Sequence, residues 1–189
     1  MATMITNAND VVTFLEDQHR QLNALFEKVL SLRGDDRANA FYSLRRMLAV
    51  HETAEEEIVH PAARRALPDG AAVVDARLRE EKEAKQALTE LEKLDVDSAE
   101  FEAQLSALRD KAIAHSEAEE RQEFERLGNV LDAPRLVRMR RAVELAEAVA
   151  PTRPHPGVES ATANFLVGPF AAMIDRSRDA LSGKTSHKS

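Results

Sequence analysis

Hydrophobic residues recur along this chain with the period of an α-helix. Asn9 or Asp10 can cap the first periodic segment, and Gly34 is typical of a helix end. Four long segments joined by short connections predict antiparallel neighbours in an up-down four-helix bundle, and a shorter fifth segment follows them. The predicted helices cover about residues 10–33, 36–67, 71–94, 98–127 and 134–150.

The sequence changes character after the fifth predicted helix. Residues 151–157 include three prolines and predict an extended linker. Residues 158–181 return to an amphipathic pattern that Gly168 and Pro169 interrupt, and residues 182–189 look disordered. An exposed apolar stripe over residues 158–181 would favour aggregation. We therefore expect this extension to dock on the bundle or to join two copies of the chain in a homodimer.

Composition agrees with an all-α protein. Ala, Leu, Glu and Arg are abundant, whereas Gly and Pro are few, so helix formers dominate nearly everywhere. A chain of 189 residues is long enough for one domain with a sizeable core and too short to make two ordinary domains the default. We expect one domain with an appendage.

Charge and residue content exclude several classes of partner. The net charge is -7 and the 26 basic residues are interspersed with 33 acidic ones, so no basic face is available for nucleic acid. No stretch approaches the roughly 18 apolar residues of a membrane span, and the N-terminus lacks a signal-peptide pattern. We expect a cytoplasmic protein. Because the chain has no cysteine, any metal must be held by histidines and carboxylates.

Two His-x-x-x-Glu pairs carry the candidate chemistry. His51 and Glu55 lie in the second predicted helix, and His115 and Glu119 lie in the fourth. Residues four apart share one face of a helix, so each pair can offer an imidazole and a carboxylate to the same point. At about 100° per residue, both pairs fall on the apolar stripe of their helix and are predicted to face the core.

The other two long helices each place one polar residue on the same kind of stripe. His19 continues the stripe of the first helix, and Glu81 occupies the centre of the stripe of the third. Taken one at a time, such histidines are more often core residues satisfied by a hydrogen bond, and such glutamates are more often solvated. Three imidazoles and three carboxylates that converge in a core need positive charge, because unpaired buried charge is costly. Arg77 and Lys85 flank Glu81 and can supply part of it, but inward basic residues of the other long helices do not suffice.

A pair of metal cations answers this need better, with carboxylates as bridges and imidazoles as terminal ligands. His60 does not join this set in a regular helix, because it lies nine residues after His51 and therefore on the opposite face. It also precedes Pro61, where we expect a kink or a break. We interpret His60 as structural, and His155 and His187 as exposed.

These residues resemble the hemerythrin-like, or HHE cation-binding, family over about residues 10–130. The resemblance rests on His19 and on the motifs that begin at His51 and His115. It implies a bundle over residues 1–133 that holds an oxo- or hydroxo-bridged di-iron centre, with Glu55 and Glu119 as bridging ligands. Residues 134–189 are similar to C-terminal extensions of actinobacterial members and carry no family ligand.

The sequence departs from the oxygen carriers of that family in its third helix. Those proteins use histidine ligands there, yet no histidine lies between His60 and His115, and Glu81 stands at the inward position. Glu80 and Glu83 point about 100° or more away from it. The expected metal ligands are His19, His51, Glu55, Glu81, His115 and Glu119.

A carboxylate in place of imidazole favours ferric iron, which favours redox turnover of hydrogen peroxide or oxygen over reversible oxygen carriage. Three alternatives stay open from the sequence. The protein could sense oxygen, nitric oxide or iron, it could carry oxygen, or it could buffer iron without turnover. Manganese and zinc also suit these ligand types.

Overall fold

The structure of the protein is a computed structural model that describes residues 10–150, and every regular element in that range is helical. This confirms the all-α prediction. The expectations for the linker 151–157, the segment 158–181, the homodimer and the tail lie outside the described residues. Within residues 10–150, no helix has the length and apolarity to cross a bilayer. The elements are α1 (Val11–Ser31), α2 (Gly34–Ala54), η1 (Glu55–Val59), α3 (His60–Ala66), α4 (Gly70–Leu91), α5 (Ala99–Glu119), η2 (Glu120–Phe124), α6 (Glu125–Val130) and α7 (Ala133–Val149).

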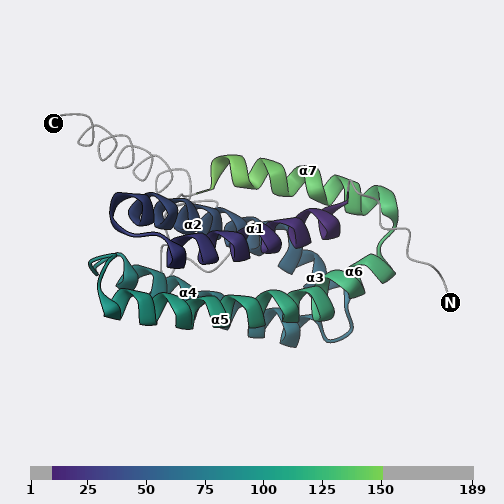
Figure 1. Cartoon of the computed structure of the whole chain (residues 1–189). Coiled ribbons are helices and arrows are strands. Elements are labelled where there is room, and N and C mark those ends of the chain that lie inside the picture. Colours follow the sequence, from purple (N-terminus) through teal and green to yellow (C-terminus); the bar gives the residue numbers. More distant parts are fainter. Residues whose placement is uncertain (1–9, 151–189) are drawn as a thin grey trace.

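The long helices form an antiparallel bundle (Figure 1). Helices α1 and α2 lie side by side on one half of the bundle, and α4 and α5 lie side by side on the other. Helix α7 covers α1 and α2 on the side away from α4 and α5. The bundle therefore has one face protected by an additional helix.

Side-chain caps define where the helices begin. The carboxylate of Asp10 accepts a hydrogen bond from the backbone N–H of Thr13 at 2.9 Å, and the hydroxyl of Ser98 accepts one from Phe101 at 3.1 Å. Each cap satisfies one of the unpaired N–H groups of the first turn. Gly34 has a φ of +57°, which glycine adopts without strain, and it begins α2 directly after α1. The predicted boundaries hold to within a few residues. The fourth predicted helix was expected to end before Gly128, but its last part, α6, continues to Val130.

The apolar core consists of two clusters that a polar layer separates. Leu15 belongs to one cluster and Leu22 to the other, and His19 lies between them on the same face of α1. On α5 and its continuation, Leu108 and Phe124 belong to opposite clusters and flank His115. The buried polar residues of the middle layer are thus held between two packed apolar ends.

Two arginines of α2 are buried, although the inward basic residues of this helix were expected not to supply enough charge for the polar layer. Arg37 donates to the carbonyl of Val96 at 2.9 Å, and Arg45 pairs with Glu92 at 2.6 Å. Both contacts lie at the end of the bundle where α4 and α5 connect. These arginines stabilise that end, so the charge argument for the middle layer stands.

The second predicted helix does not break at Pro61. It passes through a π-helical turn, η1, in which the N–H of His60 donates to the carbonyl of Glu55, five residues earlier. A proline inside an α-helix lacks one N–H and crowds the carbonyl four residues before it, and a wider turn relieves that clash. The fourth predicted helix contains a similar turn, η2, in which Glu125 donates to Glu120. It contains no proline, and nothing in its local sequence explains it.

A prediction concerns the junction of α3 and α4, where the backbone of Gly70 lies against that of Ala63. A β-carbon at Gly70 would overlap the carbonyl of Ala63, whereas one at Gly128 would meet open space. We expect Gly70→Ala to lower the free energy of unfolding by about 1–3 kcal/mol. The control Gly128→Ala should raise it by about 0.5–1 kcal/mol, because it removes glycine from a helix. Urea denaturation measures both, and equal effects would contradict the close approach at Gly70.

Candidate metal centre

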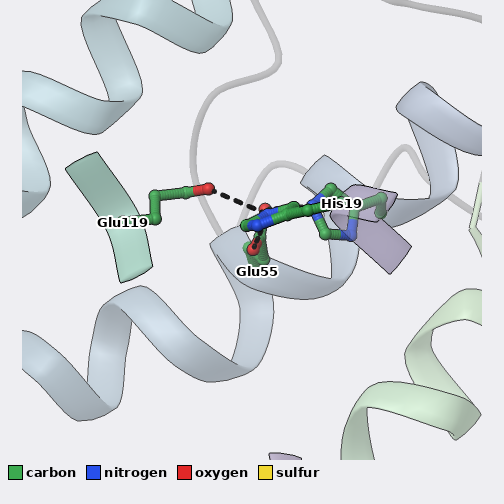
Figure 2. A group of neighbouring side chains, drawn as sticks. His19, Glu55 and Glu119 are labelled. Carbon is green, nitrogen blue, oxygen red and sulfur yellow. Dashed lines mark ion pairs between the residues drawn. The ribbon is translucent and has the colours of Figure 1, made fainter. Parts of the chain in front are cut away.

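His19, Glu55 and Glu119 come from three elements and meet in the middle layer of the bundle (Figure 2). His19 Nε2 lies 3.4 Å from Glu119 Oε2 and 4.0 Å from Glu55 Oε1. The exposed fraction is 3% for His19 and 0% for both glutamates. An imidazole and two carboxylates therefore face one another without access to bulk water.

The two His-x-x-x-Glu pairs adopt the geometry that their spacing predicts. His51 Nε2 lies 3.2 Å from Glu55 Oε2, and His115 Nε2 lies 3.2 Å from Glu119 Oε1. The rings of His19 and His51 meet edge to face with centroids 5.0 Å apart. Both motifs thus point into the same region as His19.

Each of these three histidines has an acceptor on its other ring nitrogen. Nδ1 of His51 faces Gln18 Oε1 at 2.7 Å, Nδ1 of His115 faces Glu80 Oε2 at 2.8 Å, and Nδ1 of His19 faces Glu120 Oε1 at 2.9 Å. An acceptor at Nδ1 places the ring proton there and leaves the lone pair of Nε2 pointing inward. Histidines that bind metals have this arrangement.

Helix α7 also contributes to the hydrogen bonds that orient these histidines, through Glu147. Gln18 Nε2 donates to Glu147 Oε1 at 2.6 Å, which turns the amide oxygen of Gln18 toward His51. An ionised carboxylate accepts hydrogen bonds and cannot donate them, so it sets the orientation of the amide. A residue of α7 thereby helps to fix the ring of His51.

Most of the buried side-chain atoms without a hydrogen-bond partner belong to this cluster, and the others are guanidinium nitrogens. Those of the cluster include Nε2 of His19 and of His115 and both carboxylate oxygens of Glu55 and of Glu119. Buried polar atoms are normally paired, and those left over call for an ion or a water molecule. The donor set of imidazole and carboxylate suits a hard or borderline cation. The residues therefore fit a metal on this structural ground.

The pKa values of the carboxyl groups show the same shortage of positive charge. Burial and the nearby charge of Glu119 raise the pKa of Glu55 well above its usual range. Burial would also raise the pKa of Glu119, but His115 and His19 overcome that effect and hold it well below the usual value. Of the two facing carboxyl groups, one therefore keeps its proton. Without a cation, a proton on Glu55 thus removes the negative charge of that carboxyl group.

The imidazoles divide in a similar way. Burial, together with the charge of His19, lowers the pKa of His51 to about 3, so this ring is neutral and has a free lone pair. Burial would also lower the pKa of His115, but the charge of Glu119 and its hydrogen bond raise it well above the usual value. In the absence of a cation, His115 therefore neutralises Glu119.

Glu81 is buried, as predicted. It forms a group with His115 and Glu119 in which one ligand atom from each residue lies within 4.8 Å of the others. A second group of the same kind joins His19, His51, Glu55 and Glu119. The structure thus brings all six predicted residues into two adjoining groups that share Glu119.

The interpretation of His60 as a residue on the opposite face is wrong. Its exposed fraction is 2%, and its Nε2 and Nδ1 lie 2.6 Å from Glu81 Oε1 and 3.1 Å from Glu123 Oε1. The π turn η1 inserts about one residue into the helical count, which rotates His60 by about 100° relative to a regular helix. His60, Glu119 and Glu123 form a third group with ligand atoms within 4.8 Å.

Lys85 supplies the basic charge that was expected beside Glu81. Its ammonium pairs closely with Glu56 and lies 3.9 Å from both Glu52 and Glu81. Despite burial, these carboxylates raise the pKa of Lys85 above its ordinary value. Burial raises the pKa of Glu52 to about 8 even with Lys85 beside it. One lysine therefore does not neutralise this side of the centre.

Sequence reasoning did not identify Gln18, His60 or Glu123. Gln18 lies on the buried face of α1, between Leu15 and Leu22, but its partner Glu147 is 129 residues away along the chain. His60 is misplaced by a regular helical count because it follows a π turn, whereas for Glu123 the spacing of four residues after Glu119 was an available signal. For His60, the proline that follows it was the available signal of a changed register.

The geometry defines a class of protein, namely a helical bundle whose interior carries His and Glu clusters that are able to hold metal ions. The sequence matches the hemerythrin HHE cation binding domain over residues 10–127, which is more than half of the chain. The chain therefore belongs to the hemerythrin HHE cation-binding family, as its motifs predicted. No match was found among curated proteins or among solved structures.

A prediction follows for metal removal. Without a cation, Glu55 and Glu119 face each other in a buried layer, whereas a bound metal adds its binding free energy to that of folding. Protein treated with a chelator should therefore melt at a lower temperature than the metal-bound protein. Differential scanning calorimetry measures this, and an unchanged melting temperature after confirmed metal removal would contradict a buried metal centre.

The variant Glu55→Gln should have opposite effects on the two forms. Because the pKa of Glu55 is raised in the folded state, Glu55 of the metal-free protein binds a proton on folding. This lowers the free energy of unfolding at pH values above the pKa of Glu55 in the unfolded chain, by an amount that grows as the pH rises, and has no effect below that pKa. Glutamine removes this destabilisation, so metal-free Glu55→Gln should melt above metal-free wild type at neutral pH and gain less from metal. Glu117→Gln, an exposed position on α5, is the matched control and should behave as wild type.

Proposed function

We propose that the chain holds two iron ions in the middle layer of the bundle and reacts there with hydrogen peroxide or oxygen. The ligands in this proposal are His19, His51, Glu55, Glu81, His115 and Glu119. The observation that carries it is the convergence of three Nε2 lone pairs on buried carboxylates that have no other partner.

The number two rests on the position of Glu119. Its carboxylate belongs both to the group with His19, His51 and Glu55 and to the group with Glu81 and His115. One oxygen of Glu119 lies 3.4 Å from His19 and the other lies 3.2 Å from His115. A carboxylate whose two oxygens face different imidazoles is placed to bridge two cations.

The donor types support iron in a redox role. Imidazole and carboxylate are ligands of non-haem iron, and an additional carboxylate at Glu81 favours the ferric state. Bound iron would supply the electron transfer that reaction with peroxide or oxygen requires. The surrounding residues hold the ligands in place and exclude bulk water, since Glu55 and Glu119 are fully buried.

A cavity of about 220 Å³ connects this layer with the surface. Its walls include Leu22, Leu48 and Leu108, and it reaches both the buried Glu81 and the exposed Lys111. A water molecule occupies about 30 Å³, and pockets for organic ligands usually span about 300–1,000 Å³. The cavity thus suits molecules of the size of oxygen or hydrogen peroxide, and its apolar walls do not favour larger polar substrates.

The test of the proposed function is the metal content and reactivity of protein purified from iron-supplied cells. We expect about two iron ions per chain, an absorption band in the near ultraviolet, and repeated evolution of oxygen from hydrogen peroxide. Glu119→Gln should reduce the iron content to less than about one per chain, because it removes the shared ligand. The control Glu117→Gln lies on the same helix and should keep both ions.

Two results would contradict this proposal. Stoichiometric zinc without iron after such growth would exclude an iron centre. Two bound iron ions without any turnover of peroxide or oxygen would exclude the redox role and return the choice to sensing, oxygen carriage or iron buffering.

The cavity yields a separate prediction about access. Ala112 lines the cavity on α5, so Ala112→Phe should fill it and slow the reaction with oxygen or peroxide by at least about tenfold while both iron ions stay bound. Ala107→Phe, at an exposed position of the same helix, is the control. Stopped-flow absorption measures the rate. An unchanged rate in folded Ala112→Phe would show that the substrate enters elsewhere.

A further inference from the structure

Two residues outside the His-x-x-x-Glu pairs lie at the edge of the candidate centre. Glu123 and His60 are buried, with exposed fractions of 0% and 2%. Neither is a ligand in the proposed function. Their placement depends on the two π turns, each of which directly follows the glutamate of a His-x-x-x-Glu pair or begins with it.

The π turn η2 determines where the side chain of Glu123 lies. In a regular α-helix, Glu123 would lie about 80° from His115 and about 40° from Glu119, at the edge of the inward face. One additional residue in the turn reduces the rotation from His115 by about 100°, so that Glu123 nearly aligns with His115. The turn therefore moves this carboxylate further toward the interior on the helix that carries His115 and Glu119.

Each carboxylate beside His60 has one paired and one unpaired oxygen. Oε1 of Glu123 and Oε1 of Glu81 face the two nitrogens of His60, and Oε2 of each is buried without a hydrogen-bond partner. Oε2 of Glu81 lies 3.9 Å from the ammonium of Lys85, so Oε2 of Glu123 is the less compensated of the two. Glu123 also lies with His60 and Glu119 in a group whose ligand atoms are within 4.8 Å of one another. An unpaired oxygen on a fully buried carboxylate beside other ligand atoms indicates a missing cation.

The charges around Glu123 point to the same conclusion. Among the described residues, His60 is the one ion-pair partner of Glu123. The ammonium of Lys85 pairs instead with Glu56, Glu52 and Glu81. His60 is shared between two carboxylates and so cannot neutralise both. A second cation beside Glu119 would meet the unpaired oxygen of Glu123, and it would add to the charge that Lys85 brings to Glu81.

Resting on the proposed function, we propose that Glu123 is a ligand of the second metal ion, and that His60 is the positioning residue that holds Glu81 and Glu123 for it. Glu123 and His60 together take the place of the histidines that are absent from α4. The second metal then has His115, Glu81, Glu119 and Glu123 around it, whereas the first has His19, His51, Glu55 and Glu119. The two positions differ in composition, since the second is richer in carboxylate.

The experiment compares wild type with Glu123→Gln, using full-length protein loaded with ferrous iron and oxidised in air. Wild type should bind about two iron ions and, because the spins of a ligand-bridged pair couple, show little high-spin ferric EPR signal. Glu123→Gln should bind about one ion and show the signal of an isolated ferric ion. Glu125→Gln, an exposed glutamate two residues later, is the control and should match wild type.

His60→Ala tests the positioning role. It should weaken binding of the second ion by about 10–100-fold and leave the first in place, as is typical when the residue that orients a ligand is lost. Free imidazole, which can occupy the space left by the ring, should restore part of the binding. A loss of both ions together with a loss of helical circular dichroism would instead assign His60 a purely structural role and overturn that half of the proposal.

The outcomes separate this inference from the proposed function. If wild type fails to bind two iron ions, the proposed function is wrong. If wild type binds two and Glu123→Gln also binds two with an unchanged spectrum, the assignment of Glu123 is wrong. Should Glu123→Gln not fold, Glu123→Asp replaces it. The shorter carboxylate should bind the second ion at least about tenfold more weakly, and an unchanged affinity would overturn the assignment.

Discussion

The buried carboxylates in the middle of the bundle are the constraint on which the rest of the structure depends. Glu55 and Glu119 are fully buried and their oxygens lack hydrogen-bond partners. Burying such groups without positive charge costs several kcal/mol. The chain tolerates this because two apolar clusters pack on either side, and because acceptors at Nδ1 hold three histidines in one orientation. The fold thus maintains an interior that is complete only when a cation is bound.

Two π turns adjust the bundle around that layer. Each follows a His-x-x-x-Glu pair or begins with its glutamate, and each changes which residues of the next turn face inward. Through them, His60 and Glu123 enter the interior from two different helices. Helix α7 acts from outside, since Glu147 orients Gln18 and Gln18 orients His51. The position of the candidate ligands therefore depends on elements on both sides of the bundle.

Much of this arrangement could be predicted from the sequence, and the exceptions have physical reasons. The convergence of His19, His51, Glu55, His115 and Glu119 followed from helical spacing, because the helices are regular up to those residues. His60 could not be placed, because a rule of about 100° per residue fails beyond a π turn. Gln18 could not be identified, because its role depends on Glu147, a contact that only the folded chain creates. Caps such as Asp10 and Ser98 were predictable, because their chemistry is local.

The central claim is that the middle layer holds two metal ions on either side of Glu119. Anomalous diffraction at the iron absorption edge, from crystals of iron-loaded protein, tests it most directly. The account predicts two peaks about 3.5–4 Å apart, one beside His19 and His51 and the other beside His115 and Glu81. A single peak between the helices, or iron bound only at the surface of the bundle, would contradict it.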